Sequence, residues 1–464
     1  MKKVFTLVML SILTVMNASA AETILWEGDY NVDWDLTPAD NPNREWKELG
    51  QSDFAAMTIG QKLYFYFAPV EEDYHKYNFD NWSWEALPGH EGEHDAEFGF
   101  SGYVRVEFVV TSDIKDAIAA NGFALHGHGF HVIRVTTLSS ETPAAIKWNG
   151  NQTIRNWSGD DDKCLKLTIG ELGITEACTL YVLAEKVDPE NNETGIKLMD
   201  NNWEADKDTH NTEDNYDKNY YVYDVNDIIK IDVKQWLVDI IKAEEWKNIL
   251  FWGNNMRIKA ISTSKYALLQ YSKGLLVNLD ANGFSTFSSA WKLDLANLPD
   301  GLEAYTGSLS GNTLSFVQKT TAVAAETGLL LKGTAWNPYK IPVTLDDAET
   351  VSGNALQANV VETSRNSDGS NSIYVMKKAT TAGELKFLKL TSDVNVPANR
   401  AYVLVTGAGA HELNVSFGDD ETTGINAVKG DGFMMNGYYD LQGRKVAQPT
   451  KGLYIVNGKK VVIK

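Results

Sequence analysis

The sequence predicts an all-β protein made of tandem jelly-roll-like β-sandwiches, a third β domain and a small C-terminal β domain. Short runs rich in aromatic and β-branched residues, such as residues 63–67, 103–110 and 228–233, are bounded by Gly, Asp and Asn. That pattern is typical of strands. The first half of the chain also repeats one series of landmarks, while helical periodicity is rare. Many short strands in a repeated unit indicate two β-sandwiches.

The repeat matches residues 24–138 with residues 146–263. Each copy opens on Ile-x-Trp-x-Gly, continues through Thr-Ile-Gly and Leu-Tyr, reaches a Trp after Asp and Asn, and closes on a strand containing glycine. A duplicated unit of this length is one domain present twice, because the repeats of solenoids are several times shorter. We expect sandwiches at 21–140 and 141–263, with short helices at 112–119 and 234–243.

Three further segments complete the chain. Residues 1–20 begin Met-Lys-Lys, continue through an apolar run and end Ala-Ser-Ala, which predicts a signal peptide cleaved near Ala20. Residues 264–418 have different landmarks and form the third, accessory β domain. Residues 419–464 are a linker and a small basic tail, in which Asn457-Gly458 lies between two β-rich runs and predicts a hairpin.

The composition limits the compartment and the partners. The formal net charge of -20 disfavours binding to nucleic acid or to anionic membranes. No segment is apolar for long enough to be a transmembrane span, so we expect a secreted or outer-surface protein. Cys164 and Cys178 flank the Thr-Ile-Gly of the second copy, and in an exported protein either one local disulfide or two thiols fits them.

Sugar-binding sandwiches need exposed aromatic rings for the apolar face of a sugar, with polar groups nearby for its hydroxyls. Trp26 and Trp148 open their copies and are expected to pack in the core, an interpretation that extends to Trp34 and Trp157 although both lie among polar residues. When the two copies are aligned, Trp82 matches Trp203, and Trp84 matches no Trp. His126 matches Trp252, and His128 matches Asn254. The predicted ligand-binding residues are Trp82, Trp84, His126, His128, Trp203, Trp252 and Asn254.

One motif favours a different class. His90-Glu91-Gly92-Glu93-His94 matches the zincin pattern, in which two His on one helix face bind zinc and the Glu is a general base. Pro88, Gly89 and Gly92 disfavour a helix there, so we expect a loop. No catalytic residue, cofactor or metal is predicted. The acidic clusters at 160–162 and 366–369 lack the spaced ligands of a calcium loop, which leaves calcium open only as a structural ion.

Three parts of the chain resemble known families. The tail resembles the C-terminal sorting domain of Bacteroidota proteins exported by the type IX secretion system, on the motifs Asp-Leu-Gln-Gly-Arg at 440–444 and Lys-Gly-Leu-Tyr-Ile-Val at 451–456. The repeat resembles galactose-binding-like sandwich modules that accompany glycan-degrading enzymes, on its Leu-Trp-x-Gly opening and its closing strand at 127–132. The third domain is similar to an accessory β domain of such secreted proteins. These resemblances imply an export machinery as partner and supply no catalytic motif.

The sequence therefore predicts an exported, non-catalytic binding protein whose sandwiches hold a polysaccharide or glycoconjugate. Two alternatives stay open. A cell-surface adhesin would use the same domains to bind a protein partner through a flatter surface. A zinc metallopeptidase would be built on His90, Glu91 and His94.

Overall fold

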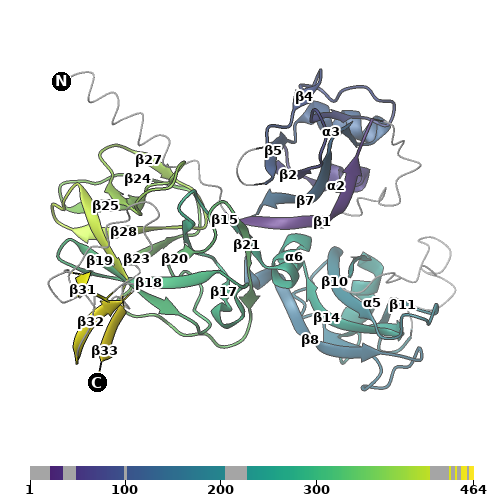
Figure 1. The fold of residues 1–464 in the computed structure, drawn as a ribbon. Coiled ribbons are helices and arrows are strands. Elements are labelled where there is room, and N and C mark those ends of the chain that lie inside the picture. The colour runs from purple at the N-terminus through teal and green to yellow at the C-terminus, as the bar shows by residue number, and fades with distance from the viewer. Residues whose placement is uncertain are drawn as a thin grey trace. The chain divides into compact units, whose positions relative to one another are not determined.

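The computed structural model describes residues 21–34, 49–98, 102–139, 141–203 and 227–417, and the strand residues 438–439, 445–446, 451–456 and 459–463. The protein is all-β and multidomain, as predicted, with short helices between the strands (Figure 1). It divides into two compact units, one ending at Phe417 and one holding the tail. The expected signal peptide, the linker at 419–424 and Asn457-Gly458 lie outside the described residues. Within the described part, no helix is both long and apolar enough to cross a membrane.

The first sandwich packs a larger sheet against a smaller one. Its core contains large aromatic side chains, among them Phe65, Phe67 and Phe108, all fully buried. The larger sheet has the order β1 (Glu22–Val32), β7 (Phe130–Leu138), β2 (Lys62–Pro69), β5 (Val104–Val109). The smaller sheet has the order β4 (His94–Asp95), β3 (Lys76–Asp80), β6 (Ala124–His128), and the helices are α2 (Gln51–Ala56) and α3 (Ser112–Asn121).

The second sandwich repeats the topology of the larger sheet and has an aliphatic core. Its larger sheet has the order β8 (Ile146–Ile154), β14 (Met256–Ser262), β10 (Cys178–Lys186), β12 (Asp227–Val233). Its smaller sheet has the order β11 (Gly195–Asp200), β13 (Asn248–Asn254), β9 (Leu165–Thr168), and the helices are η1 (Pro143–Ala145) and α5 (Gln235–Ala243). The third strand of this smaller sheet lies beside β13 instead of beside β11, the equivalent of β3. The four strands of each larger sheet follow the same order along the chain, and α5 takes the place of α3. Cys164 and Cys178 are both free thiols.

The accessory segment begins with α6 (Lys265–Lys273) and is built mainly on one long sheet. That sheet has the order β16 (Phe284–Phe287), β20 (Leu329–Lys332), β18 (Glu303–Ser310), β19 (Thr313–Lys319), β29 (Glu412–Phe417), β26 (Phe387–Lys389), β25 (Asn371–Met376), β28 (Arg400–Thr406), β23 (Leu356–Asn359). The smaller elements are β17 (Lys292–Leu293) with β22 (Val343–Thr344), β24 (Thr363–Arg365) with β27 (Val394–Val396), and η3 (Leu295–Asn297).

Two strands of the accessory segment extend the larger sheet of the first sandwich. β15 (Leu275–Asn278) pairs antiparallel with β1, and β21 (Pro338–Ile341) pairs with β15, which gives a six-stranded sheet (Figure 1). Backbone hydrogen bonds therefore run from the first sandwich into the accessory segment. The chain after the second sandwich returns to the first one before it forms its own long sheet.

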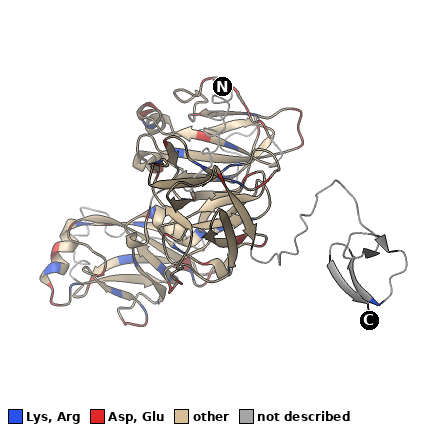
Figure 2. Ribbon diagram, turned by 90° about the vertical axis from the view of Figure 1, so that its left-hand side faces the viewer, with Lys and Arg blue, Asp and Glu red and all other residues tan. Residues whose placement is uncertain are grey.

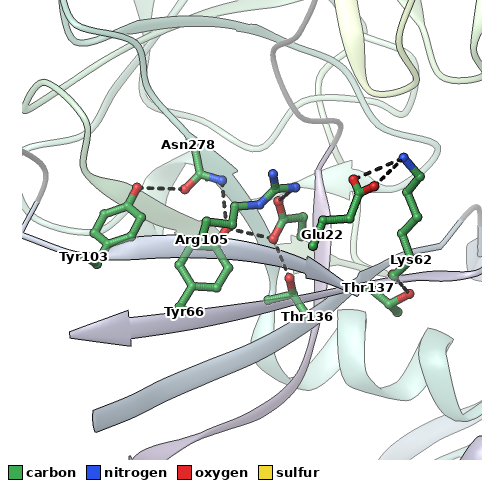
Figure 3. Close-up of polar contacts among 9 residues, drawn as sticks. Glu22, Lys62, Tyr66, Tyr103, Arg105, Thr136, Thr137 and Asn278 are labelled. Atoms are coloured by element: carbon green, nitrogen blue, oxygen red, sulfur yellow. Dashed lines mark hydrogen bonds and ion pairs between the residues drawn. The ribbon is translucent and has the colours of Figure 1, made fainter. Parts of the chain in front are cut away.

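A buried ion pair lies at this junction (Figure 3). The Glu22 carboxylate is fully buried, lies 2.7 Å from a nitrogen of Arg105, and accepts a 2.8 Å hydrogen bond from the Tyr66 hydroxyl. Asn278 of β15 donates to the same hydroxyl at 2.9 Å. Burial raises the pKa of Tyr66 well above its usual range, and the charge of Glu22 adds to this effect. Glu22 thus links β1 to side chains of β2 and β5, and Tyr66 extends this network to β15, in addition to the backbone pairing of β1 with β7 and β15.

The tail forms a small sheet of its own. Its order is β31 (Lys445–Val446), β30 (Tyr438–Tyr439), β32 (Gly452–Val456), β33 (Lys459–Ile463). Val456 pairs with Lys459, so the strands on either side of the predicted Asn457-Gly458 turn are antiparallel neighbours, as expected of a hairpin.

Candidate functional site

The strand register fixes which residues of the two sandwiches are equivalent. Tyr77 of β3 pairs with Gly127 of β6, and Ile196 of β11 pairs with Gly253 of β13. A Cβ on Gly127 would lie 2.2 Å from the Lys76 carbonyl oxygen, and one on Gly253 would lie 2.0 Å from the Gly195 oxygen. Both glycines allow the same close approach of two backbones. His126 and Trp252 are therefore equivalent, as the sequence predicts.

The register corrects the pairing of the tryptophans. Seven residues after Tyr77 comes Trp84, and seven residues after Ile196 comes Trp203. Both have a left-handed backbone, with φ of 61° and 60°, and both donate their backbone N–H to the carbonyl three residues earlier. The sequence pairs Trp203 with Trp82 because similar Asp and Asn residues precede each, but in the strand register these two tryptophans are offset by two positions. Trp84 has a counterpart, and Trp82 corresponds to Asn201.

In the first sandwich these positions form the first aromatic cluster, which consists of Trp34, Trp84 and His126. The His126 ring contacts both indoles, with its centroid 4.4 Å from that of Trp84 and 4.5 Å from that of Trp34. Its Nδ1 is hydrogen-bonded to the buried Asp80 carboxylate at 3.0 Å. The Trp34 indole N–H donates to the Tyr74 hydroxyl at 3.2 Å. Trp84 is 43 % exposed, so one face of the cluster is open to solvent.

The second sandwich has the second aromatic cluster, which consists of Trp157, Trp203 and Trp252. The Trp252 ring takes the central place of His126, 4.8 Å from Trp157 and 5.5 Å from Trp203. The Trp157 indole N–H donates to the carboxylate of Glu193 at 3.0 Å, and Glu193 is the register equivalent of Tyr74. The two clusters therefore share their architecture and differ in their polar partners.

Backbone strain concentrates at these clusters. Trp84, Trp157 and Trp203 all have positive φ, between 46° and 61°. A bulky residue in this region is an outlier that costs about 1–3 kcal/mol and persists where the surrounding structure imposes it. In the second cluster the Trp252 indole N–H is buried without a hydrogen-bond partner among the described residues. An unsatisfied donor of this kind costs about 1–3 kcal/mol.

The remaining predicted site residues lie close to the clusters but have other contacts. His128 stacks on Tyr74 at 4.5 Å and is hydrogen-bonded to Asp33. Trp82 is 56 % exposed and its ring lies over Gly122, where a Cβ would be 2.1 Å from the indole. Asn254 differs from the expected ligand contact. It is buried, accepts from the backbone N–H of Asn156 and donates to the Glu193 carbonyl, so it positions the turn that carries Trp157.

Two members of the clusters were interpreted from the sequence as packing residues. Unlike Trp34 and Trp157, Trp26 and Trp148 do pack against the cores of their sandwiches, each over the glycine two residues later. The polar neighbours of Trp34 and Trp157 were the available signal of a different role. A core strand carries few Asp and Asn residues, since these side chains are mostly exposed.

The His-Glu-Gly-Glu-His segment is not helical. It forms a turn that leads into the two-residue strand β4, and Gly89 and Gly92 have left-handed φ of 82° and 87°. The His90 ring stacks on Phe108 at 4.9 Å, and burial lowers the pKa of His90, with a smaller contribution from the neighbouring His94. The described residues contain no group of three or more His, Cys, Asp or Glu side chains arranged to hold a metal.

Acidic and basic residues are interspersed along the described strands and loops of the unit that ends at Phe417 (Figure 2). Near the second cluster, the backbone N–H of Asn202 donates to the Glu244 carboxylate at 3.2 Å, which fixes the turn before Trp203. Burial raises the pKa of Glu244, and the hydrogen bond and the charge of Asp200 raise it further. Two carboxyl groups therefore hold this turn, because the backbone N–H of Asn202 also donates to Asp200 at 2.9 Å.

Comparisons with known proteins give little further information. No protein-family model and no curated protein matches the chain. Among solved structures it is similar to SGBP-B from the mixed-linkage glucan utilization locus of Bacteroides ovatus, in complex with a mixed-linkage heptasaccharide. The sequence identity is 28 % and the TM-score 0.22, and the match covers 25 % of this chain and 30 % of that one. A likeness of this extent decides neither the fold nor the function of the chain.

Proposed function

We propose that the two sandwiches bind glycans through the first and second aromatic clusters. The observation that carries this proposal is the recurrence of an exposed, backbone-strained Trp beside a central ring at register-equivalent positions. Strain that recurs in both copies without serving the core points to a functional role. Indole faces offer apolar surfaces for sugar rings, while Tyr74 and Glu193 place hydroxyl and carboxylate groups at the edges for sugar hydroxyls.

The test removes the exposed ring from each cluster. Trp84→Gly and Trp203→Gly take away the indole and leave a residue that accepts the left-handed backbone, so both sandwiches should stay folded. We expect each change to weaken polysaccharide retention in native affinity gels about tenfold at its own site, which is about 1.4 kcal/mol. The double variant should lose retention altogether.

Trp336 supplies a matched control. It has the same left-handed backbone, with φ of 63°, but belongs to the accessory segment and to neither cluster. Trp336→Gly should leave retention unchanged. Equal retention of the wild type and the Trp84→Gly, Trp203→Gly double variant on every polysaccharide tested would refute glycan binding at the clusters. Binding of a protein partner that depends on the same tryptophans would favour the adhesin instead.

The location of this activity is also part of the proposal. The sequence features of residues 1–20 and of the tail support export to the cell surface or medium. In that setting the sandwiches would meet extracellular polysaccharide, and the tail would serve the export machinery rather than the glycan. Absence of catalysis belongs to the same proposal, since the clusters offer stacking and hydrogen bonds but no assembled acid, base and nucleophile.

A further inference from the structure

A pocket opens beside the second aromatic cluster. Its cavity volume is about 530 Å³, and its lining includes Gln152, Asp161, Lys166, Asn201, Trp246 and Asn248. Trp246 is 65 % exposed, so its indole is one of the most accessible large apolar groups among the described residues. An exposed Trp above polar side chains is the combination that a sugar ring requires.

The pocket and the second cluster lie on the same face of the small sheet. Asn248 and Trp252 are four residues apart on β13, so their side chains point to the same side at a separation of about 13 Å. Lys166 of β9 pairs with Leu250, which places it on that face as well. The Trp203 ring lies over Gly159, two residues before Asp161 of the pocket wall. Pocket and cluster are thus neighbouring parts of one surface.

The side chains of the pocket favour a neutral ligand. Its two charged groups neutralise each other, because the Lys166 ammonium lies 2.7 Å from the Asp161 carboxylate. Gln152, Asn201 and Asn248 add three carboxamides, each of which both donates and accepts hydrogen bonds. The side chains of Asn201 and Asn248 have no hydrogen-bond partner within the part of the chain that the structure describes.

In the first sandwich a side chain occupies the position that corresponds to the pocket. By register, Asn201 is equivalent to Trp82, whose ring lies against Gly122 just after α3. In the second sandwich Glu244 holds the turn at Asn201 and Asn202 by accepting hydrogen bonds from their backbone N–H groups. The exposed Trp of this corner is Trp246. An indole thus covers this corner of the first sandwich, whereas a pocket occupies it in the second.

We infer that the pocket is a second sugar subsite, which binds a neutral sugar residue on Trp246 while the same glycan chain stacks on the second aromatic cluster. This inference rests on the proposed function and adds the class of ligand and its minimum length. The second sandwich should therefore bind longer chain segments than the first. Oligosaccharides too short to span the roughly 13 Å between Asn248 and Trp252 should gain nothing from the pocket.

The experiment uses the full chain with two pocket variants. Trp246→Ala removes the platform, and Asn201→Trp fills the pocket with the residue that the first sandwich has in that position. The probes are hydroxyethylcellulose, galactomannan and xyloglucan in native affinity gels, with alginate as a charged comparison. Each variant should weaken retention on the neutral polymer that binds the wild type by about tenfold, with an unchanged melting temperature. Titration with oligosaccharides of that polymer should show wild-type affinity rising with chain length and Trp246→Ala affinity reaching its limit earlier.

The outcomes separate this inference from the proposed function. If Trp203→Gly weakens retention but Trp246→Ala and Asn201→Trp do not, the second cluster binds glycan and the pocket is not a subsite. If the wild type is retained by none of the polymers, both the proposed function and the subsite are refuted. Retention on alginate that depends on Trp246 would overturn the neutral class of ligand. Trp82→Asn, the reverse change in the first sandwich, should leave the dependence on Trp246 intact.

Discussion

Replacing Glu22 by Ala should destabilise the first sandwich more than any surface change in the protein. The carboxylate is fully buried and holds both the Arg105 guanidinium, at 2.7 Å, and the Tyr66 hydroxyl, at 2.8 Å. Burial opposes the charge on Arg105, but the attraction of Glu22 outweighs it and raises the pKa of Arg105. Removal of one partner of a buried pair leaves an uncompensated charge and costs about 3–5 kcal/mol. Because the Arg105 side chain is 26 % exposed, water solvates part of it, and the lower end of this range applies.

Urea unfolding followed by tryptophan fluorescence measures the loss, with differential scanning calorimetry to separate the transitions of a multidomain chain. The transition that includes the first sandwich should shift by about 3 kcal/mol in Glu22→Ala and by less in Glu22→Gln, which keeps an acceptor for Tyr66. The matched control is Glu107→Ala. Its partner Lys62 and Glu107 itself are both 45 % exposed, so about 0–1 kcal/mol is expected. Equal shifts for Glu22→Ala and Glu107→Ala would refute the argument.

Three further predictions follow from particular contacts. The pKa of Glu244 is higher in the folded protein than in the unfolded chain, where it is near 4.5. Protonated Glu244 therefore stabilises the fold at a pH below 4.5, and this stabilisation is lost as the pH rises through the pKa of the folded state. Glu244→Gln should therefore raise the melting temperature relative to wild type at pH 7.5 but not at pH 4, and a gap independent of pH would contradict this. Gly253→Ala should cost about 1–3 kcal/mol in thermal unfolding because its Cβ would meet the Gly195 carbonyl at 2.0 Å, whereas Gly170→Ala, whose Cβ has no neighbour nearer than 3.8 Å, should be neutral. Deletion of residues 425–464 should leave both sandwiches folded but stop delivery to the cell surface, and normal surface delivery of the truncated protein would disprove the proposed role of the tail.

The all-β class of the chain was predictable from the sequence because its signals are local. Aromatic and β-branched runs predict strands. The opening Trp-x-Gly pattern recurs in β1 and β8, and in each strand the Trp ring lies over the glycine of the pattern. The sheet shared by β1 and β15 has no such signal. Its strands are some 250 residues apart, and pairing of distant strands depends on backbone groups that every residue carries.

The candidate site was predictable in its location but not in its membership. The glycines of the closing strands led to His126 and Trp252, since a glycine within a strand indicates close backbone approach. The sequence does not reveal the equivalence of Trp84 and Trp203, because the Asp and Asn residues before Trp82 and before Trp203 align well at a shift of two residues. Strand pairing removes that ambiguity, because the cross-strand pairs Tyr77–Gly127 and Ile196–Gly253 fix which residues of β3 and β11 are equivalent.

The corrected equivalence of Trp84 and Trp203 changes what divergence between the two copies means. Residues that pack a shared core are expected to keep their type, and residues that contact a ligand are expected to vary with it. Trp84 and Trp203 keep their type although both are more than a third exposed and both are in a strained backbone conformation. Packing does not account for this, because each ring leaves much of its surface in water and its replacement by Gly would relieve strain. The residues around them differ between the two copies instead. At equivalent positions the first sandwich has His126, Tyr74 and Trp82, and the second has Trp252, Glu193 and Asn201. A common stacking residue with different polar surroundings is expected if both copies bind the same class of ligand. The two copies would then differ in the part of the ligand that each binds and in the length of that part.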